Sequence, residues 1–303
     1  MKAKDKMRNF ISCFSISYLT IVNAACQLIA LCVLLVSCNS HVDQNMVNYS
    51  TSVDSALIYY QQGWQEIMDY GDYAAAEVSY RKSLDHDSEF LVGKSVLARL
   101  TLDLDERIQL YESIQAGKHA ITGDERLILD VYSALTKYTN LRDQKSPLTK
   151  RALKDALDMG EHNFRKIVHT YPEEIYLKCE YIEILHSQYG AAQSLDSLNK
   201  LVADHQQTNP FLLGYKAILT AEMKNYNEAL EYALQLKEQM KNLEVAKPDA
   251  ILADIYFKMK DYENAKLHAD KAFQIDHRNL DASRLKEKID VKLDSLNGSS
   301  VLE

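Results

Sequence analysis

The chain has 303 residues, and its 43 acidic residues outnumber its 35 lysines and arginines to give a formal net charge of −8. An acidic surface repels phosphate, so this balance argues against nucleic-acid binding and against adhesion to anionic lipid by charge alone. Nine glycines and four prolines are few for this length. Because turns between strands depend on these residues, we expect a mostly helical chain.

The first predicted element is an apolar segment near the N-terminus. No charged residue occurs from Asn9 to Ser40, basic residues precede this run, and residues 28–36, "LIALCVLLV", are its most apolar part. A basic start followed by an apolar stretch is typical of a secretory signal, which we assign to residues 1–37. An uncleaved transmembrane helix is the alternative, because about 20 apolar residues can span a bilayer. Both hypotheses place the rest of the chain on the far side of the membrane.

The segment ends in "LVSC", Leu35 to Cys38, which resembles the lipobox of bacterial lipoproteins. The resemblance implies cleavage before Cys38 and attachment of palmitate-type lipid to that residue, and several acyl chains give a stable membrane anchor. Asn39 follows, whereas the inner-membrane retention signal of that class has aspartate there. The resemblance therefore implies a lipid-anchored protein of the bacterial cell envelope, with the outer membrane favoured over the inner. Residues 38–54 are polar and lack periodicity, which predicts a tether between lipid and folded body.

The remaining chain contains internal repeats. Stretches that begin at Gly71, Lys224 and Lys260 each carry an aromatic residue at the third position and alanine three residues later. The aligned residues are Tyr73, Tyr226 and Tyr262, followed by Ala76, Ala229 and Ala265. Steps of three and four residues mark one face of a helix, and a second helical segment precedes each stretch. Repeated helix pairs predict an α-solenoid, in which each pair buries its apolar face against its neighbours.

These repeats resemble the 34-residue tetratricopeptide (TPR) pattern over residues 57–90, 210–243 and 246–279. In the first copy Trp64 stands where a small residue is expected, and a shift by one residue places Gly63 there instead. Helix pairs also fit between these copies, at 91–103 with 105–116, 124–140 with 148–170, and 173–189 with 192–207. A polar-faced capping helix is predicted over 280–296. We thus predict an all-α protein, an α-solenoid of about six TPR-like pairs over residues 55–296, followed by a flexible tail at 297–303.

No catalytic motif is present in the sequence, so we predict no enzyme activity, no cofactor and no metal site. His162 and His169 are seven residues apart on one predicted helix, too far for one metal without a third ligand. Cys179 lies in the helical run "IYLKCEYIEIL", which favours a buried small side chain over a reactive thiol.

Binding in the TPR family usually uses a concave groove lined by the first helix of each pair. The resemblance implies a partner groove lined here by Ile58, Gln61, Gln65, Met68, Phe211, Ile218, Glu222, Asp254 and Phe257. Such a mixture of apolar and polar residues suits a peptide or a helix of a partner protein. The expected function is a membrane-anchored scaffold that binds other envelope proteins.

The alternative function is a surface glycan-binding lipoprotein, since nineteen tyrosines and Trp64 offer aromatic faces on which sugars can stack. Many of the tyrosines occupy core positions of the repeats, however. Trp64 itself is expected to cap the N-terminal face of the solenoid.

Overall fold

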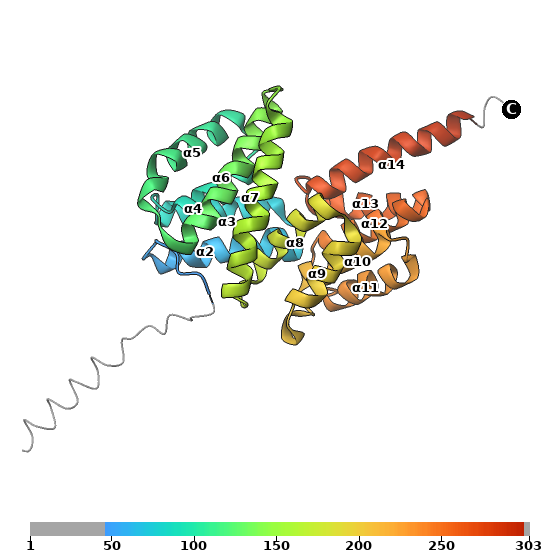
Figure 1. Ribbon diagram of the computed structural model, residues 1–303. Helices are drawn as coiled ribbons and strands as arrows, with labels where there is room; N and C mark the ends of the chain where they lie inside the picture. Colours follow the sequence, from blue (N-terminus) through green and yellow to red (C-terminus); the bar gives the residue numbers. More distant parts are fainter. Residues whose placement is uncertain (1–45, 300–303) are drawn as a thin grey trace, which may run out of the picture. The chain divides into compact units, whose positions relative to one another are not determined.

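The computed structural model describes residues 46–299 (Figure 1), and every regular element in that range is helical. The helices pack as consecutive pairs. The pairs are α2 (Asp54–Trp64), continued by η1 (Gln65–Tyr70), with α3 (Tyr73–His86); α4 (Leu91–Leu100) with α5 (Leu104–Gly117); α6 (Gly123–Asp143) with α7 (Thr149–Thr170); α8 (Ile175–Tyr189) with α9 (Ala191–Leu201); α10 (Pro210–Glu222) with α11 (Tyr226–Gln239); and α12 (Lys247–Met259) with α13 (Tyr262–Ile275). The helix α14 (Leu280–Ser299) follows, and two short 3₁₀ helices, η2 (Lys118–Ala120) and η3 (Asp204–Gln206), lie in connections. The all-α class is confirmed. The predicted signal peptide, Cys38 and the first part of the predicted tether lie outside the described residues.

Short polar side chains fix where several helices begin. Asp72 and Asp103 accept hydrogen bonds from amides in the first turns of α3 and α5. Asn209 does the same for Leu212, and Pro210 follows it at the first helical position of α10. Each cap satisfies an amide that has no partner within its helix. These side chains therefore fix the starts of α3, α5 and α10.

A π-helical turn, η1, resolves the irregular spacing of the first repeat. Ala217 and Ala253 each precede the aligned tyrosine of their repeat by nine residues, whereas Gly63 precedes Tyr73 by ten. Gly63 is the small residue of its pair, because a Cβ added there would lie 2.4 Å from Tyr80. The wider π-helical turn over Gln65–Tyr70 accommodates the one extra residue.

The three repeats turn between their helices through the same backbone conformation. Gly71 has φ of 70°, and Lys224 and Lys260 both have φ of 66°. A left-handed conformation is favourable for glycine but costs a residue with a side chain about 1 kcal/mol.

Replacing Lys260 by glycine is therefore expected to raise the free energy of unfolding by about 0.5 kcal/mol, after the greater freedom of glycine in the unfolded chain is subtracted. Urea denaturation measures the change. The same replacement at Lys271, exposed within α13, should destabilise by about 1 kcal/mol. A Lys260→Gly protein less stable than the wild type would contradict the left-handed backbone conformation of Lys260.

The predicted repeat faces are buried. Ala76, Ala229 and Ala265 have no solvent exposure. Neighbouring first helices also contact one another, α4 with α6, α10 with α12, and α12 with α14. The buried alanines of the second helices leave room for the two helices of each pair to pack closely.

The prediction of a tether over 38–54 is wrong at its C-terminal end. Residues 46–53, which we call the strap, pack on the helices. The amide of Val47 donates to Glu174 (2.7 Å), and the amide of Ser50 donates to Glu125 (2.9 Å). Tyr49 contacts the rings of Tyr60 and Phe90 edge-on. A polar composition hid this packing because the strap is held through its backbone amides, which any sequence carries.

The start of α3 is joined to the turn before α14 by contacts that we call the clasp. The amide of Tyr73 donates to Asp276 (2.8 Å), the side chain of Asn279 donates to the carbonyl of Gly71 (2.7 Å), and Arg278 pairs with Glu77. Asn279 is 2% exposed and also caps α14 through Ala282. The clasp thus joins the first helix pair to the start of α14, the last helix described.

The helix α14 continues to Ser299, beyond the predicted boundary of the capping helix. The rest of the predicted tail lies outside the described residues. Within residues 46–299, no helix combines the length and apolar character needed to cross a bilayer.

Candidate functional site: a charged pocket between the first helices

A pocket of about 610 Å³ lies between the first helices of five pairs, α2 with η1, α4, α8, α10 and α12. Residues of α3 and α14 complete its wall. The volume falls within the range of about 300–1,000 Å³ that is usual for ligand sites.

The apolar part of the wall continues the aromatic core. Trp64 is 5% exposed, stacks on Tyr176 with ring centroids 6.2 Å apart, and meets Tyr80 edge-on. The expectation that Trp64 caps an outer face is wrong, because rings from several helices surround it. Tyr80 also lines the pocket, and its buried hydroxyl has no hydrogen-bond partner in the described part of the chain.

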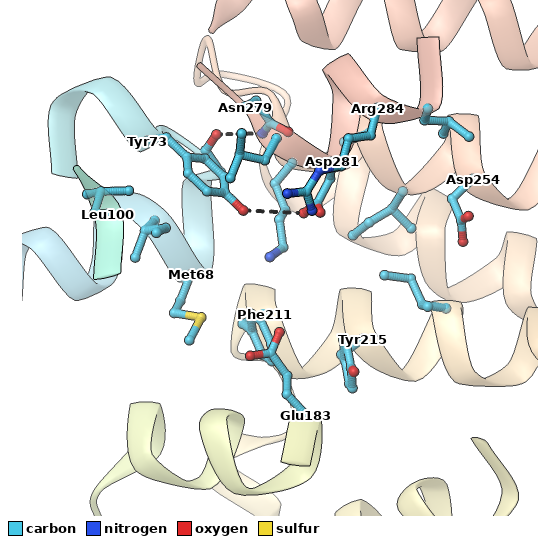
Figure 2. Close-up of a pocket in the computed structure, with 18 of the residues that line it drawn as sticks. Met68, Tyr73, Leu100, Glu183, Phe211, Tyr215, Asp254, Asn279, Asp281 and Arg284 are labelled. Atoms are coloured by element: carbon cyan, nitrogen blue, oxygen red, sulfur yellow. Dashed lines mark hydrogen bonds between the residues drawn. The ribbon is translucent and has the colours of Figure 1, made fainter. Parts of the chain in front are cut away.

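Helix α14 closes one side of the pocket. Figure 2 shows Asp281 and Arg284 projecting from α14 opposite Glu183 of α8. The hydroxyl of Tyr73 donates to Asp281 at 3.5 Å, next to the clasp contact of Asn279. The clasp therefore positions α14 over the pocket.

Several charges in the wall are already paired. Arg99 forms an ion pair with Glu180 at 3.0 Å and covers the ring of Tyr132. Lys258 pairs with Asp254 and lies 3.8 Å from Glu222. These pairs satisfy their own charges, so they shape the wall and leave the binding of a ligand to other groups.

Glu183 and Lys247 differ from these pairs. Within the described range, neither the Glu183 carboxylate nor the Lys247 ammonium group has a hydrogen-bond or ion-pair partner; Lys247 lies 4.3 Å from the centre of the Phe211 ring. Burial raises the pKa of Glu183 to about 8, and repulsion from Glu180 adds to the rise. Burial lowers the pKa of Lys247, against the attraction of Asp281 and Glu183. Two half-buried ionisable groups without partners are a common mark of a ligand site.

The structure brings together only part of the predicted groove. Met68, Phe211, Ile218, Glu222 and Asp254 line the charged pocket. The buried side chain of Phe211 serves mainly as core, and it stacks on Tyr215 at 5.2 Å.

The other predicted groove residues lie elsewhere. Ile58, Gln61 and Gln65 line a second pocket, of about 760 Å³, between the strap and α2. Phe257 lines a third, open pocket beside α14. The TPR pattern assumes that a first helix faces the groove along its whole length. In the first pair, only the C-terminal end of the first helix, with η1, lines the charged pocket.

Cys179 and His169, two side chains considered as reactive or metal-binding groups, are respectively buried and bonded within the protein. Cys179 is fully buried, as predicted, and burial raises the pKa of its thiol well above the usual value. His169 contacts the carbonyl of Arg165 in its own helix. Among residues 46–299 no group of three or more histidine, cysteine, aspartate or glutamate side chains is arranged to hold a metal ion.

Two central pocket residues, Glu183 of α8 and Arg284 of α14, lie on helices that contribute nothing to the predicted groove set. A signal for α8 was present in the proline spacing. Ile218 lies eight residues after Pro210, and Glu180 lies eight residues after Pro172. Glu180 is therefore the α8 position that corresponds to Ile218, and Glu183 lies about one helical turn further along α8.

The fold and the site define an all-α chain of paired helices with a charged pocket on the faces of the first helices. Comparison with protein-family models and with curated proteins found no match for the chain. The TPR pattern therefore stands as a resemblance carried by the residues quoted above.

Proposed function

We propose that the chain is a bacterial lipoprotein, anchored through Cys38, whose TPR-like helix pairs form a solenoid that binds a segment of another envelope protein. The observation that carries this proposal is the position of the pocket. Its wall comes from the first helices of five of the six described pairs, which are the helices that the TPR resemblance assigns to binding. The protein acts as a binding scaffold without catalysis, facing outward from the membrane that its lipid enters, with the outer membrane favoured.

The size of the pocket narrows what the scaffold accepts. The pocket measures about 610 Å³, within the range of about 300–1,000 Å³ that is usual for sites of small ligands. A short peptide segment or a chain end of the partner suits a pocket of this size.

The burial of Trp64 also favours the scaffold over the alternative glycan-binding lipoprotein. A sugar needs an open aromatic face, whereas Trp64 is packed against Tyr176 and Tyr80. The Trp64 ring, which suggested sugar stacking, is thus part of the hydrophobic core.

The test is recovery of a partner from detergent extracts with the tagged full chain. Ile218→Arg places a bulky charge in the pocket wall near the acids Glu222 and Asp254. Leu148→Arg adds the same charge at a residue that is 57% exposed, outside the pocket. We expect the Ile218 variant to lose the partner and the Leu148 variant to keep it, with matching thermal melts.

Equal recovery by both variants would show that the partner binds elsewhere. Failure of the wild type to recover any specific protein would count against the scaffold. Phe211 is unsuitable for this test because it is buried, and its removal would disturb the core.

A further inference from the structure

The pocket retains unpaired charge of both signs after its internal ion pairs are counted. The acids in its wall are Glu180, Glu183, Glu222, Asp254 and Asp281, and the bases are Arg99, Lys247, Lys258, Arg284 and Lys288. Arg99 and Lys258 are engaged by Glu180, Asp254 and Glu222. The acids left without an ion pair are Glu183 and Asp281, and the bases left without one are Lys247, Arg284 and Lys288. Among these five side chains, only Asp281 has a polar contact within residues 46–299, the 3.5 Å hydrogen bond from Tyr73.

We propose that this pocket binds a short zwitterionic peptide, with Glu183 receiving its free ammonium group and Lys247 together with Arg284 receiving its carboxylate. The inference rests on the proposed function, since it names the ligand chemistry of the same pocket. It departs from that function in one respect: the ligand is a free short peptide, recognised by its two ends of opposite charge, in place of a segment within a larger protein.

The balance of charge selects this class of ligand. A purely anionic ligand would pair Lys247 and Arg284 but leave Glu183 without a cationic partner. A purely cationic ligand would do the reverse. Since a half-buried charge without a counter-charge is costly, a ligand with both charges gains at both ends. Figure 2 shows Glu183 on one side of the opening and Arg284 on the other, so the two ends would be held apart.

The rest of the wall fits a peptide better than other zwitterions. A quaternary ammonium group prefers open aromatic faces, but the Phe211 ring is stacked on Tyr215 and covered by Lys247. A primary ammonium group instead needs an acceptor such as a carboxylate. The apolar residues Ile67, Met68 and Leu100 in the wall can contact the side chains of a peptide.

Binding should also release a proton. The Glu183 carboxyl faces charged or titratable groups from every helix around it: Glu180 and Cys179 on α8, Arg99 on α4, Tyr73 on α3, Tyr215 on α10, Lys247 on α12 and Asp281 on α14. At pH 7.5 the carboxyl is mostly protonated, because its pKa is raised to about 8. A ligand ammonium group at this position lowers that pKa and expels the proton.

The experiment titrates the full chain in detergent with a randomised tripeptide mixture prepared in four forms: free, N-acetylated, C-amidated, and capped at both ends. We expect the free form to bind about tenfold or more tightly than the doubly capped form, with single caps between, because each end loses a charge-assisted bond. In Glu183→Gln, acetylation should no longer matter. In Arg284→Gln, at an exposed residue, amidation should matter less. Glu112→Gln, at an exposed position outside the pocket, serves as the control.

Titration calorimetry at pH 7.5 in two buffers with different heats of ionisation measures the released proton, which Glu183→Gln should abolish. Equal binding of all four forms would overturn the zwitterion inference while leaving a peptide-binding scaffold intact. Tightest binding by the acetylated form would also overturn it and indicate an anion site. If no form binds, the inference fails, and the partner recovery described above decides the proposed function separately.

Discussion

Replacing Trp64 by alanine is expected to lower the free energy of unfolding by about 3–5 kcal/mol, the usual range for removing a large buried aromatic side chain. Trp64 contacts the rings of Tyr60, Tyr80, Tyr132 and Tyr176, which come from four different helices. Alanine would leave a void among groups that cannot close it without moving whole helices. Trp64 also lines both the charged pocket and the pocket beneath the strap, so the variant should connect the two.

Urea denaturation followed by circular dichroism measures this loss. Ile58→Ala is the matched control because Ile58 lies on the same helix and is 61% exposed, so the expected change is within about 0.5 kcal/mol. A Trp64→Ala protein as stable as the control would mean that the tryptophan lies at the surface. That result would revive the glycan-binding alternative.

The second large effect is a loss of stability as pH rises, caused by Glu174. This carboxyl is buried beneath the strap, and burial raises its pKa from the usual 4.5 to about 7, against the hydrogen bond from the Val47 amide. Between these values the folded chain retains a proton that the unfolded chain has lost. Stability therefore falls from about pH 4.5 to about pH 7 and then levels, by at most about 3 kcal/mol. Detachment of the strap would rehydrate the carboxylate, so this figure is an upper bound.

Glu174→Gln keeps the shape of the protonated acid and removes the titration. We expect the variant to match the wild type at pH 5 and to exceed its stability by about 1–3 kcal/mol at pH 8. Thermal and urea melts at pH 5, 6, 7 and 8 measure the divergence. Glu125 and Glu183 also have pKa values raised by burial, so the variant should retain a weaker fall of its own. Parallel curves for wild type and variant would rule out Glu174 as the cause, and exposed Glu112→Gln controls for net charge.

Local patterns in the sequence were sufficient to place the helices. The periodic tyrosines and alanines predict α3, α11 and α13, and the polar caps predict where helices such as α5 and α10 begin. These signals act over three or four residues, which is the distance over which a helix repeats. The ambiguity at Gly63 and Trp64 was visible in the sequence as one extra residue, although its structural form, a π-helical turn, was not.

The site was harder to predict from the sequence than the helices, because its residues are far apart in the chain. Asp281 and Arg284 enter the pocket only because the clasp brings α14 to α3, and no periodic pattern encodes that meeting. The strap has the same character, since Glu125 and Glu174 bind backbone amides about 75 and 127 residues away. The family register predicted Met68, Ile218 and Asp254 in the pocket. It also included Ile58 and Phe257, because it assumes that every first helix faces the same space.

The clasp determines when the pocket can form during synthesis of the chain. Gly71 and Asn279 are 208 residues apart, so the ribosome completes nearly the whole body before the final wall can be added. Contacts this distant close slowly, since the loop between them must first lose its freedom. A chain that emerges N-terminus first should therefore remain unable to capture its ligand until its last helix has docked, which would keep the nascent protein from engaging that ligand prematurely.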